Sequence, residues 1–201
     1  MELVQGEGGV HALDKEFVNK AAELCESRDI LFIDDEVQVG IGRSGTLFAF
    51  EQYGIKPDIV SFAKGIGAGL PIGGIICGPK TCDVLMPGDH GSTFGMNPVA
   101  CAGGCVVLDT LDKAFLDSVN SKSEYFRTEL MKMKKVTGLD GLGLMIGIDL
   151  DGMTGGEAVA KLMEEGVLAI PAGSRLRLLP PLTISEEEMD RALDAIRKVL
   201  D

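Results

Sequence analysis

The chain has 201 residues, of which 45% are hydrophobic and 25% are charged, and its formal net charge is −12. This composition is typical of a globular protein that buries one large core or two smaller ones. The acidic balance disfavours nucleic acid and anionic membrane surfaces as partners, and no apolar run is long enough to cross a membrane.

The first part of the chain alternates between predicted helices and strands. Asp14 is suited to cap an amphipathic helix over 14–28, because apolar residues follow it at helical spacing. The other elements predicted here are strands at 30–34, 59–62 and 75–77, a short helix at 46–53, glycine-rich loops at 40–45 and 87–96, and a long helix at 97–118. This alternation is typical of an α/β layer.

The character of the sequence changes near residue 119. A polar, Lys- and Glu-rich helix is predicted there, and Ser185 with Glu188 forms a capping box for the last helix. The predicted elements are helices at 120–135, 156–165 and 185–199, and strands at 143–150, 167–171 and 174–178. We therefore expect two domains, residues 1–118 and residues 119–201, the second being a smaller α+β unit.

Neither secretion nor metal binding is indicated. The first residues lack the basic and apolar regions of a signal peptide, so we expect a cytoplasmic protein. The five cysteines form no Cys-x-x-Cys pair, and both histidines are distant from Cys101 and Cys105 in the sequence. We expect reduced thiols and no metal site.

Two polar residues stand where predicted strands end. Asp35 follows the apolar run 30–33, and Lys64 follows the strand at 59–62 and precedes glycine-rich sequence. Ligands of open α/β sheets bind at the carboxyl ends of strands. A pyridoxal phosphate site needs an amine that bonds to the cofactor aldehyde and an acid that keeps the pyridine nitrogen protonated. Taken singly, Lys64 is equally a surface lysine, and Asp35 with its acidic neighbours is equally a solvated turn.

The setting of Lys64 predicts more than its residue type does. It follows an apolar strand, so we expect its side chain to be shielded from water. Small residues around it leave room for a bulky ligand; they are Ala63, Gly65, Gly67, Ala68 and Gly69.

Two glycine-containing motifs have competing interpretations. Residues 40–45 match the GxGxxG pattern of dinucleotide-binding proteins, but no strand runs directly into the first glycine, which favours a simple turn. In residues 90–95, Ser92 and Thr93 carry hydroxyls that can hold phosphate oxygens together with backbone N–H groups. On the residues alone, a plain loop is the favoured interpretation of this second motif.

Two arginines and one glutamate are candidates for substrate binding. Alternation along a strand puts Arg175 and Arg177 on the same face, and a guanidinium suits bidentate capture of a carboxylate. The alternative for this segment is a solvated edge strand. Glu7 is a charged residue in a glycine-lined loop, for which the alternative is an ordinary turn.

Six segments taken together resemble the class III pyridoxal-phosphate-dependent aminotransferases, in the same order along the chain. They are residues 3–10, 35–38, 42–45, 64–73, 90–98 and 178–182. The resemblance covers essentially the whole chain. It implies an α/β fold, namely the C-terminal part of the large domain of a fold-type I pyridoxal phosphate transferase, with a mixed, mainly parallel sheet, followed by a small α+β domain.

The resemblance also implies roles for the residues of the cofactor site. Lys64 would bind pyridoxal 5′-phosphate covalently and, once released, move a proton between substrate and cofactor. Asp35 would pair with the pyridinium nitrogen, and Gln38 would bind near the ring hydroxyl. Thr93, supported by Ser92, would contact the cofactor phosphate of a partner subunit.

For the substrate, the resemblance implies that Arg177 binds the α-carboxylate of glutamate. Glu7 would pair with this arginine when the other substrate presents its terminal amine. The chain most resembles the acetylornithine-type branch, which would transfer an amino group between N-acetylornithine and 2-oxoglutarate in arginine biosynthesis. Ornithine, succinylornithine and 4-aminobutyrate aminotransferases share these motifs and remain alternatives.

The sequence departs from the family pattern in two ways. The family's N-terminal portion, which carries the main phosphate-binding loop and an aromatic residue that stacks on the cofactor, does not precede Met1. We therefore expect a truncated or split chain, active as a homodimer or through complementation by an N-terminal half, with weak cofactor binding and low turnover alone. A non-catalytic remnant that acts as an association module is the alternative. Met96 also stands where the family usually has glycine, and we expect it to crowd its loop.

Overall fold

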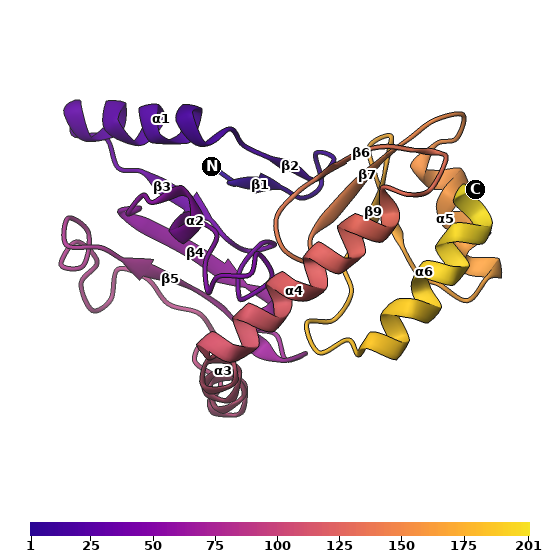
Figure 1. Cartoon of the computed structure of the whole chain (residues 1–201). Coiled ribbons are helices and arrows are strands. Elements are labelled where there is room, and N and C mark those ends of the chain that lie inside the picture. The colour runs from indigo at the N-terminus through magenta and orange to yellow at the C-terminus, as the bar shows by residue number, and fades with distance from the viewer. The chain divides into compact units, whose positions relative to one another are not determined.

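The computed structural model describes residues 1–201, which form two compact units (Figure 1). Unit 1 comprises Met1–Leu3, Leu13–Gly42 and Thr46–Phe115. Unit 2 comprises Val4–Ala12, Arg43–Gly45 and Leu116–Asp201. None of the helices is both long enough and apolar enough to span a lipid bilayer.

Unit 1 is built around a three-stranded mixed sheet. Its strands are β3 (Ile33–Asp35), β4 (Ile59–Ala63) and β5 (Gly73–Cys77), in the order β3-β4-β5. β3 runs parallel to β4, and β5 runs antiparallel to it. The carboxyl ends of β3 and β4 therefore lie at the same edge of the sheet.

The first strand is shorter than the segment 30–34 predicted from its apolar residues. The N–H of Ile30 bonds to the carbonyl of Cys25, and the N–H of Phe32 donates to the Asp58 carboxylate at 2.8 Å. These backbone donors are therefore not available to a β ladder. The predicted strands at 59–62 and 75–77 are confirmed within one or two residues.

The helices of unit 1 begin at residues whose side chains cap them. Asp14 accepts a hydrogen bond from the N–H of Phe17 at the start of α1 (Lys15–Ser27), as predicted. The short helix α2 (Phe50–Tyr53) ends at Gly54, whose φ of 75° suits glycine. A buried apolar cluster holds this unit together, and its members are Ile41, Phe48, Val60 and Ile66.

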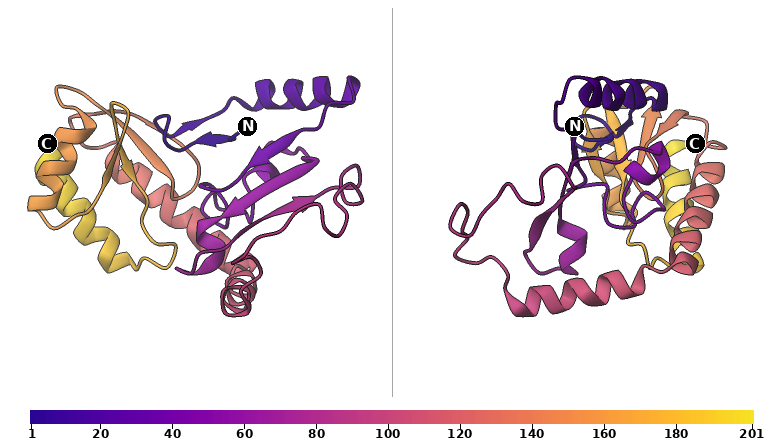
Figure 2. Two further views of the ribbon diagram at one scale, coloured as in Figure 1. Left: turned by 180° about the vertical axis from the view of Figure 1, so that it is seen from behind. Right: turned by 90° about the vertical axis from the view of Figure 1, so that its left-hand side faces the viewer.

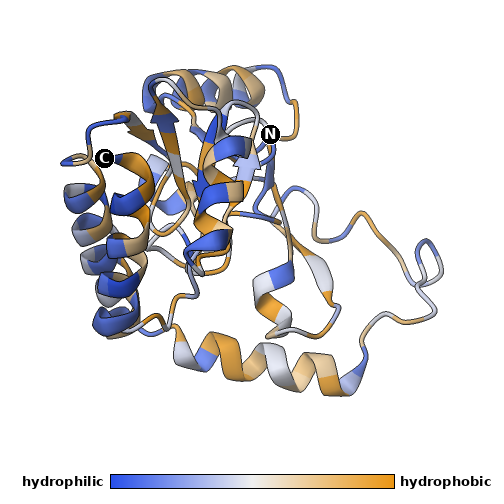
Figure 3. Ribbon diagram, turned by 90° about the vertical axis from the view of Figure 1, so that its right-hand side faces the viewer, coloured by the Kyte–Doolittle hydropathy of each residue, from blue (hydrophilic) through white to orange (hydrophobic).

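The long helix predicted at 97–118 is wrong in its extent. α3 (Pro98–Thr110) is capped by Asn97 and ends after thirteen residues, and it is apolar along most of its length (Figure 3). Asp112 then accepts a hydrogen bond from the N–H of Phe115, which caps the next helix, α4 (Lys113–Leu130). Because this second cap lies directly after α3, the chain forms two separate helices instead of one long helix.

Unit 2 contains a four-stranded sheet that is antiparallel throughout. Its strands are β6 (Val136–Asp140), β7 (Ile146–Leu150), β8 (Ile170–Ala172) and β9 (Arg175–Leu178), in the order β6-β7-β9-β8. A small hairpin, which the sequence did not predict, pairs β1 (Val4–Gln5) with β2 (His11–Ala12).

Two helices of unit 2 pack beside each other near the C-terminus: α5 (Gly155–Glu164) and α6 (Glu186–Leu200) (Figure 1). Each begins with a complete capping box, Thr154 with Glu157 and Ser185 with Glu188, and the second box was predicted. The buried apolar residues of α6 recur at helical spacing; they are Met189, Leu193, Ile196 and Leu200.

The region between α4 and β7 differs from its prediction. The strand expected over 143–150 is found as β7, whereas the helix expected over 120–135 ends at Leu130 and is followed by β6, which was not predicted. Lys135 donates from its backbone N–H to the Leu200 carbonyl, and its own carbonyl accepts from the N–H of Asp151. These tertiary hydrogen bonds override the helical propensity of the lysine-rich segment.

Candidate functional site

In unit 1, Asp35 ends β3 and its carboxylate is fixed by two donors. Its Oδ1 accepts hydrogen bonds from the N–H of Val37 at 3.0 Å and from the hydroxyl of Ser61 at 3.1 Å. Ser61 is the β4 residue that pairs with Asp35 in the parallel ladder. The half-buried carboxylate therefore has a fixed orientation, and its Oδ2 is left for a further donor.

Lys64 follows β4 directly and starts the single 3₁₀ turn at Lys64–Gly67. Its φ is 50°, a left-handed value that costs a non-glycine residue about 1–3 kcal/mol. The expected shielding of this lysine is wrong, since its side chain is exposed in this chain. The strand ends before Lys64, and neighbours such as Gly65 and Ala68 are too small to cover an amine. Asp35 and Lys64 nevertheless share the carboxyl-end edge of two adjacent parallel strands.

Two acids flank Asp35 and are completely buried, so the solvated turn is wrong for them. Asp34 and Glu36 are both 0% exposed. Burial raises the pKa of Asp34 to about 6. Burial, reinforced by the charge of Asp34, raises the pKa of Glu36 to about 9.

The scarcity of hydrogen-bond donors around these two buried acids accords with the upward direction of both pKa shifts. Glu36 Oε1 accepts from the N–H of Phe50 at 3.0 Å, whereas Glu36 Oε2 and both oxygens of Asp34 lack a donor from the rest of the chain. The raised pKa of Glu36 means that this carboxyl keeps a proton at neutral pH, and such a proton can supply one of these missing donors. Reasoning from the sequence missed this pair because three consecutive acids indicate solvent exposure.

The other predicted cofactor residues lie in unit 1 on irregular segments. Gln38 is half-buried in the turn after β3. Ser92 and Thr93 lie on the exposed segment that connects β5 to α3 (Figure 2). Ser92 lines an open pocket of about 730 Å³ together with Gly73 and Gly74 of β5 and several residues of the connecting segment. Thr93 does not line this pocket.

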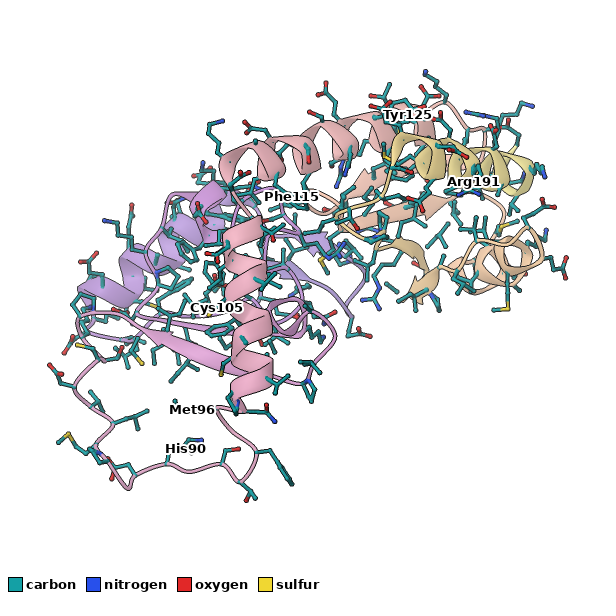
Figure 4. All side chains as sticks on the ribbon, turned by 90° about the horizontal axis from the view of Figure 1, so that it is seen from below. His90, Met96, Cys105, Phe115, Tyr125 and Arg191 are labelled. Atoms are coloured by element: carbon teal, nitrogen blue, oxygen red, sulfur yellow. The ribbon has the colours of Figure 1, made fainter.

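Met96 belongs to the same segment, which Figure 4 shows with His90 and Met96 labelled. Its φ is 55°, a left-handed value that favours glycine. Its side chain is 88% exposed, so the expected crowding of the loop is not seen within this chain.

The glycine-rich motif at 40–45 forms turns, as predicted. β3 ends at Asp35, with four residues between it and Gly40, and the next helix begins only at Phe50. Gly42 and Gly45 have positive φ values of 77° and 91°. The segment therefore lacks the strand-to-helix junction that a dinucleotide-binding loop requires.

In unit 2, Arg177 and Glu7 form an ion pair between a buried and an exposed residue. Arg177 Nη1 donates to Glu7 Oε1 at 3.1 Å. The arginine side chain is 5% exposed, whereas that of Glu7 is 77% exposed. β9 lies between β7 and β8, so the alternative of a solvated edge strand is wrong.

This asymmetry determines what the pair can do chemically. Nε of Arg177 is buried without a hydrogen-bond partner, which leaves a donor of a buried guanidinium unsatisfied. An incoming carboxylate can satisfy that donor and form a bidentate pair. Glu7 can move away at little cost, because its carboxylate is already largely hydrated.

Arg175 lies on the same face of β9, and its guanidinium is the centre of a network that was not predicted. It forms a bidentate pair with Asp149 at 2.8 and 2.9 Å, and Nη1 contacts Asp140 Oδ2 at 2.9 Å. Hydrogen bonding to Asp149 raises the pKa of Arg175. Burial alone would raise the pKa of Asp140, but its hydrogen bonds from Arg175 and from backbone amides outweigh burial and lower it. The alternation of Arg175 with Arg177 was the one available sign of this role.

Comparison with known proteins gives a consistent result. The sequence model of the Aminotransferase class-III family matches residues 1–200. The acetylornithine aminotransferase of Haemophilus ducreyi is 45% identical over 201 residues, which are 100% of this chain and 51% of that protein. The acetylornithine aminotransferase of Aquifex aeolicus is 42% identical over 100% of this chain and 53% of its own length.

Solved structures give the same picture. Ornithine aminotransferase from Toxoplasma gondii has a TM-score of 0.90 and 36% identity over 99% of this chain and 50% of its own. N-acetylornithine aminotransferase from Stenotrophomonas maltophilia has a TM-score of 0.89 and 34% identity over 98% of this chain and 54% of its own. The chain therefore spans about half the length of the relatives it matches.

Proposed function

Since the chain belongs to the class-III aminotransferase family, we propose that it serves a transamination that depends on pyridoxal phosphate, between N-acetylornithine and 2-oxoglutarate. The choice of substrates is supported by relatives named acetylornithine aminotransferase that are 40–45% identical to this chain. Ornithine aminotransferases are also among the similar structures, at 36% identity for one of them. We favour the acetylated substrate because the more similar relatives carry that name.

The residues of unit 1 fit the cofactor. The Oδ2 atom of Asp35 can accept a hydrogen bond from a protonated pyridine nitrogen, and Oδ1 is already held by Val37 and Ser61. The exposed amine of Lys64 stands at the same sheet edge and can bond covalently to an aldehyde. Bound pyridoxal phosphate would supply an electron sink for the substrate.

Each residue then has a defined task. Asp35 would pair with the ring nitrogen and keep it protonated. Lys64 would hold the cofactor through Nζ and, with this amine free, would serve as the base that moves a proton during the transfer. Gln38 would donate from its side-chain amide near the ring hydroxyl, and the hydroxyl of Thr93, supported by Ser92, would bind the cofactor phosphate of a partner subunit.

The ion pair between Arg177 and Glu7 is the observation that carries the proposal. A transaminase must accept two substrates of different shape and charge in turn. Arg177 binds the α-carboxylate of glutamate or 2-oxoglutarate once Glu7 has moved away. When the terminal amine of acetylornithine is presented, Glu7 stays paired and neutralises the buried guanidinium.

Calorimetric titration of the chain with 2-oxoglutarate tests this assignment. We expect Arg177→Met to abolish binding and Glu7→Ala to strengthen it about tenfold, because a competing charge-assisted hydrogen bond is lost. Arg197→Met is the matched control, since Arg197 lies on α6 and pairs with Glu129 and Asp194 rather than with Glu7. Equal binding by the chain and by Arg177→Met would reject the role of Arg177.

We also propose a protein partner for unit 1, namely a polypeptide that supplies the N-terminal half found in the relatives. Large apolar side chains of this unit are exposed on the sheet and on α3, including Ile33, Ile75, Ile76, Val99 and Val106. Apolar surface of this kind marks an interaction site. It occurs in a chain that spans about half the length of its relatives.

Co-expression with the first half of a related acetylornithine aminotransferase tests this partner. We expect a stable complex that turns over acetylornithine and 2-oxoglutarate, and low turnover by the chain alone. Formation of a homodimer that is equally active without the added half would contradict the proposal.

A further inference from the structure

The loop that carries Glu7 is anchored on its C-terminal side by contacts outside the hairpin ladder. It joins β1 to β2, and Nη1 of Arg175 lies 3.2 Å from the carbonyl of Gly9 and 3.0 Å from that of Val10. Beyond them, the N–H of Ala12 donates to Asp140 Oδ1 at 3.1 Å. Since Asp140 is itself bonded to Arg175, one network fixes residues 9–12.

The backbone inside this network adopts a conformation that it would not keep unaided. Val10 is fully buried and has a φ of 57°, which is a genuine outlier for a β-branched side chain. Such values persist only where the surroundings over-determine them. The two carbonyl contacts of Arg175 flank this residue and supply part of that constraint.

Close packing on β7 supplies the rest. A Cβ added to Gly147 would lie 2.8 Å from Val10 Cβ and 3.1 Å from the Gly9 carbonyl oxygen, so the loop rests directly on the strand there. Gly147 pairs with Arg177 in the sheet register. The anchored residues of the loop therefore lie against the strand position that neighbours Arg177.

The network ends before Glu7. The Glu7 side chain accepts a hydrogen bond from Arg177 and is 77% exposed. Residues 7–12 thus form a short arm that is anchored at 9–12 and whose exposed Glu7 side chain pairs with Arg177. Gly8 links these two parts of the arm.

We propose that Arg175 is a positioning residue that anchors this arm so that Glu7 returns to Arg177, and that it thereby sets the balance between the two substrate classes. The consequence for substrates rests on the proposed function. The positional claim, that Arg175 acts on Arg177 through Glu7, can be tested without cofactor or substrate.

The experiment measures how fast phenylglyoxal modifies Arg177, by peptide mass mapping of the chain. Four proteins are compared: the unmodified sequence, Glu7→Ala, Arg175→Lys and the double variant. Glu7→Ala should raise the rate about tenfold, because the arginine loses its charge-assisted partner. Arg175→Lys should raise it severalfold, since an ammonium cannot span Asp149 and the loop carbonyls as a planar fork does.

Non-additivity is the decisive result. If Arg175 acts through Glu7, adding Glu7→Ala to Arg175→Lys should increase the rate by less than twofold beyond the single change. Hydrogen exchange should also rise in the amides of residues 8–12 of Arg175→Lys. An unchanged rate in Arg175→Lys, or fully additive rates in the double variant, would overturn the proposal.

Two controls separate positioning from general destabilisation. Arg197→Met removes two ion pairs of unit 2 away from the loop and should leave the Arg177 rate unchanged. Arg175→Lys keeps a positive charge near Asp149 and Asp140, so we expect this variant to fold. If 2-oxoglutarate binding proves independent of Arg177, the proposed function fails while the modification rates still decide the role of Arg175.

Discussion

The buried pair of Asp34 and Glu36 makes a prediction about stability and pH. Glu36 has a pKa of about 9 in the folded chain, well above its value in the unfolded chain, and it therefore takes up a proton on folding at neutral pH. Its stabilising contribution is fully present below pH 4.5, the ordinary value, and is lost as pH rises through about 9. The pKa of Asp34 is also raised on folding, so its contribution to stability is likewise lost with rising pH, between pH 3.8 and about pH 6.

The size of this pH dependence follows from the uptake of one proton on folding. Between about pH 6 and 9 the folded chain holds a proton on Glu36 that the unfolded chain has released. The free energy of unfolding should therefore fall by up to about 1.4 kcal/mol per pH unit through this pair. In Glu36→Gln the amide donates to Asp34 at any pH, so this part of the slope should disappear.

Urea denaturation at a series of pH values measures the slope directly. Glu23→Gln, which changes an exposed acid of the same unit, is the control and should preserve the pH dependence of the unmodified chain. Parallel stability curves for the unmodified chain and Glu36→Gln would refute the shared proton. A large loss of stability in Glu36→Gln at pH 6 would refute it as well.

Three further predictions concern unit 2. Gly147→Ala should destabilise the chain by about 1–3 kcal/mol in urea denaturation, because its Cβ would clash with Val10; an unaffected midpoint would show that the loop is not seated on β7. Ser185→Ala should lower stability by about 1 kcal/mol through loss of the capping box of α6, and a wild-type melting curve would contradict this. In the complemented enzyme, Glu7→Ala should shift kcat/KM in favour of glutamate over acetylornithine, and an unchanged ratio would reject the role of Glu7.

Local chemistry explains which parts of the fold could be predicted. The caps at Asp14 and Ser185 and the glycine turn at 40–45 depend on neighbouring residues alone, and all three are found in the structure. The hairpin of β1 and β2 depends on pairing between two-residue strands, which leave almost no periodic signal. Likewise, β6 is set by tertiary bonds from Lys135 rather than by its own sequence.

The site shows the same division. Asp35 and Lys64 were predicted as site residues because each is a polar residue that follows a strand. Arg175 and Arg177 were predicted because side chains alternate between the two faces of a strand. Burial of Asp34 and Glu36 could not be predicted, because it depends on which segments cover the strand end. The exposure of Lys64 also depends on what covers it, and nothing in this chain does.

Covalent labelling of Lys64 tests the central claim most directly. The chain, alone and with the complementing half, is loaded with pyridoxal phosphate, reduced with borohydride and mapped by peptide mass spectrometry. The account predicts a phosphopyridoxyl group on Nζ of Lys64, lost in Lys64→Ala and weakened in Asp35→Asn. A label that falls on another lysine, or that persists undiminished in a folded Lys64→Ala variant, would contradict it.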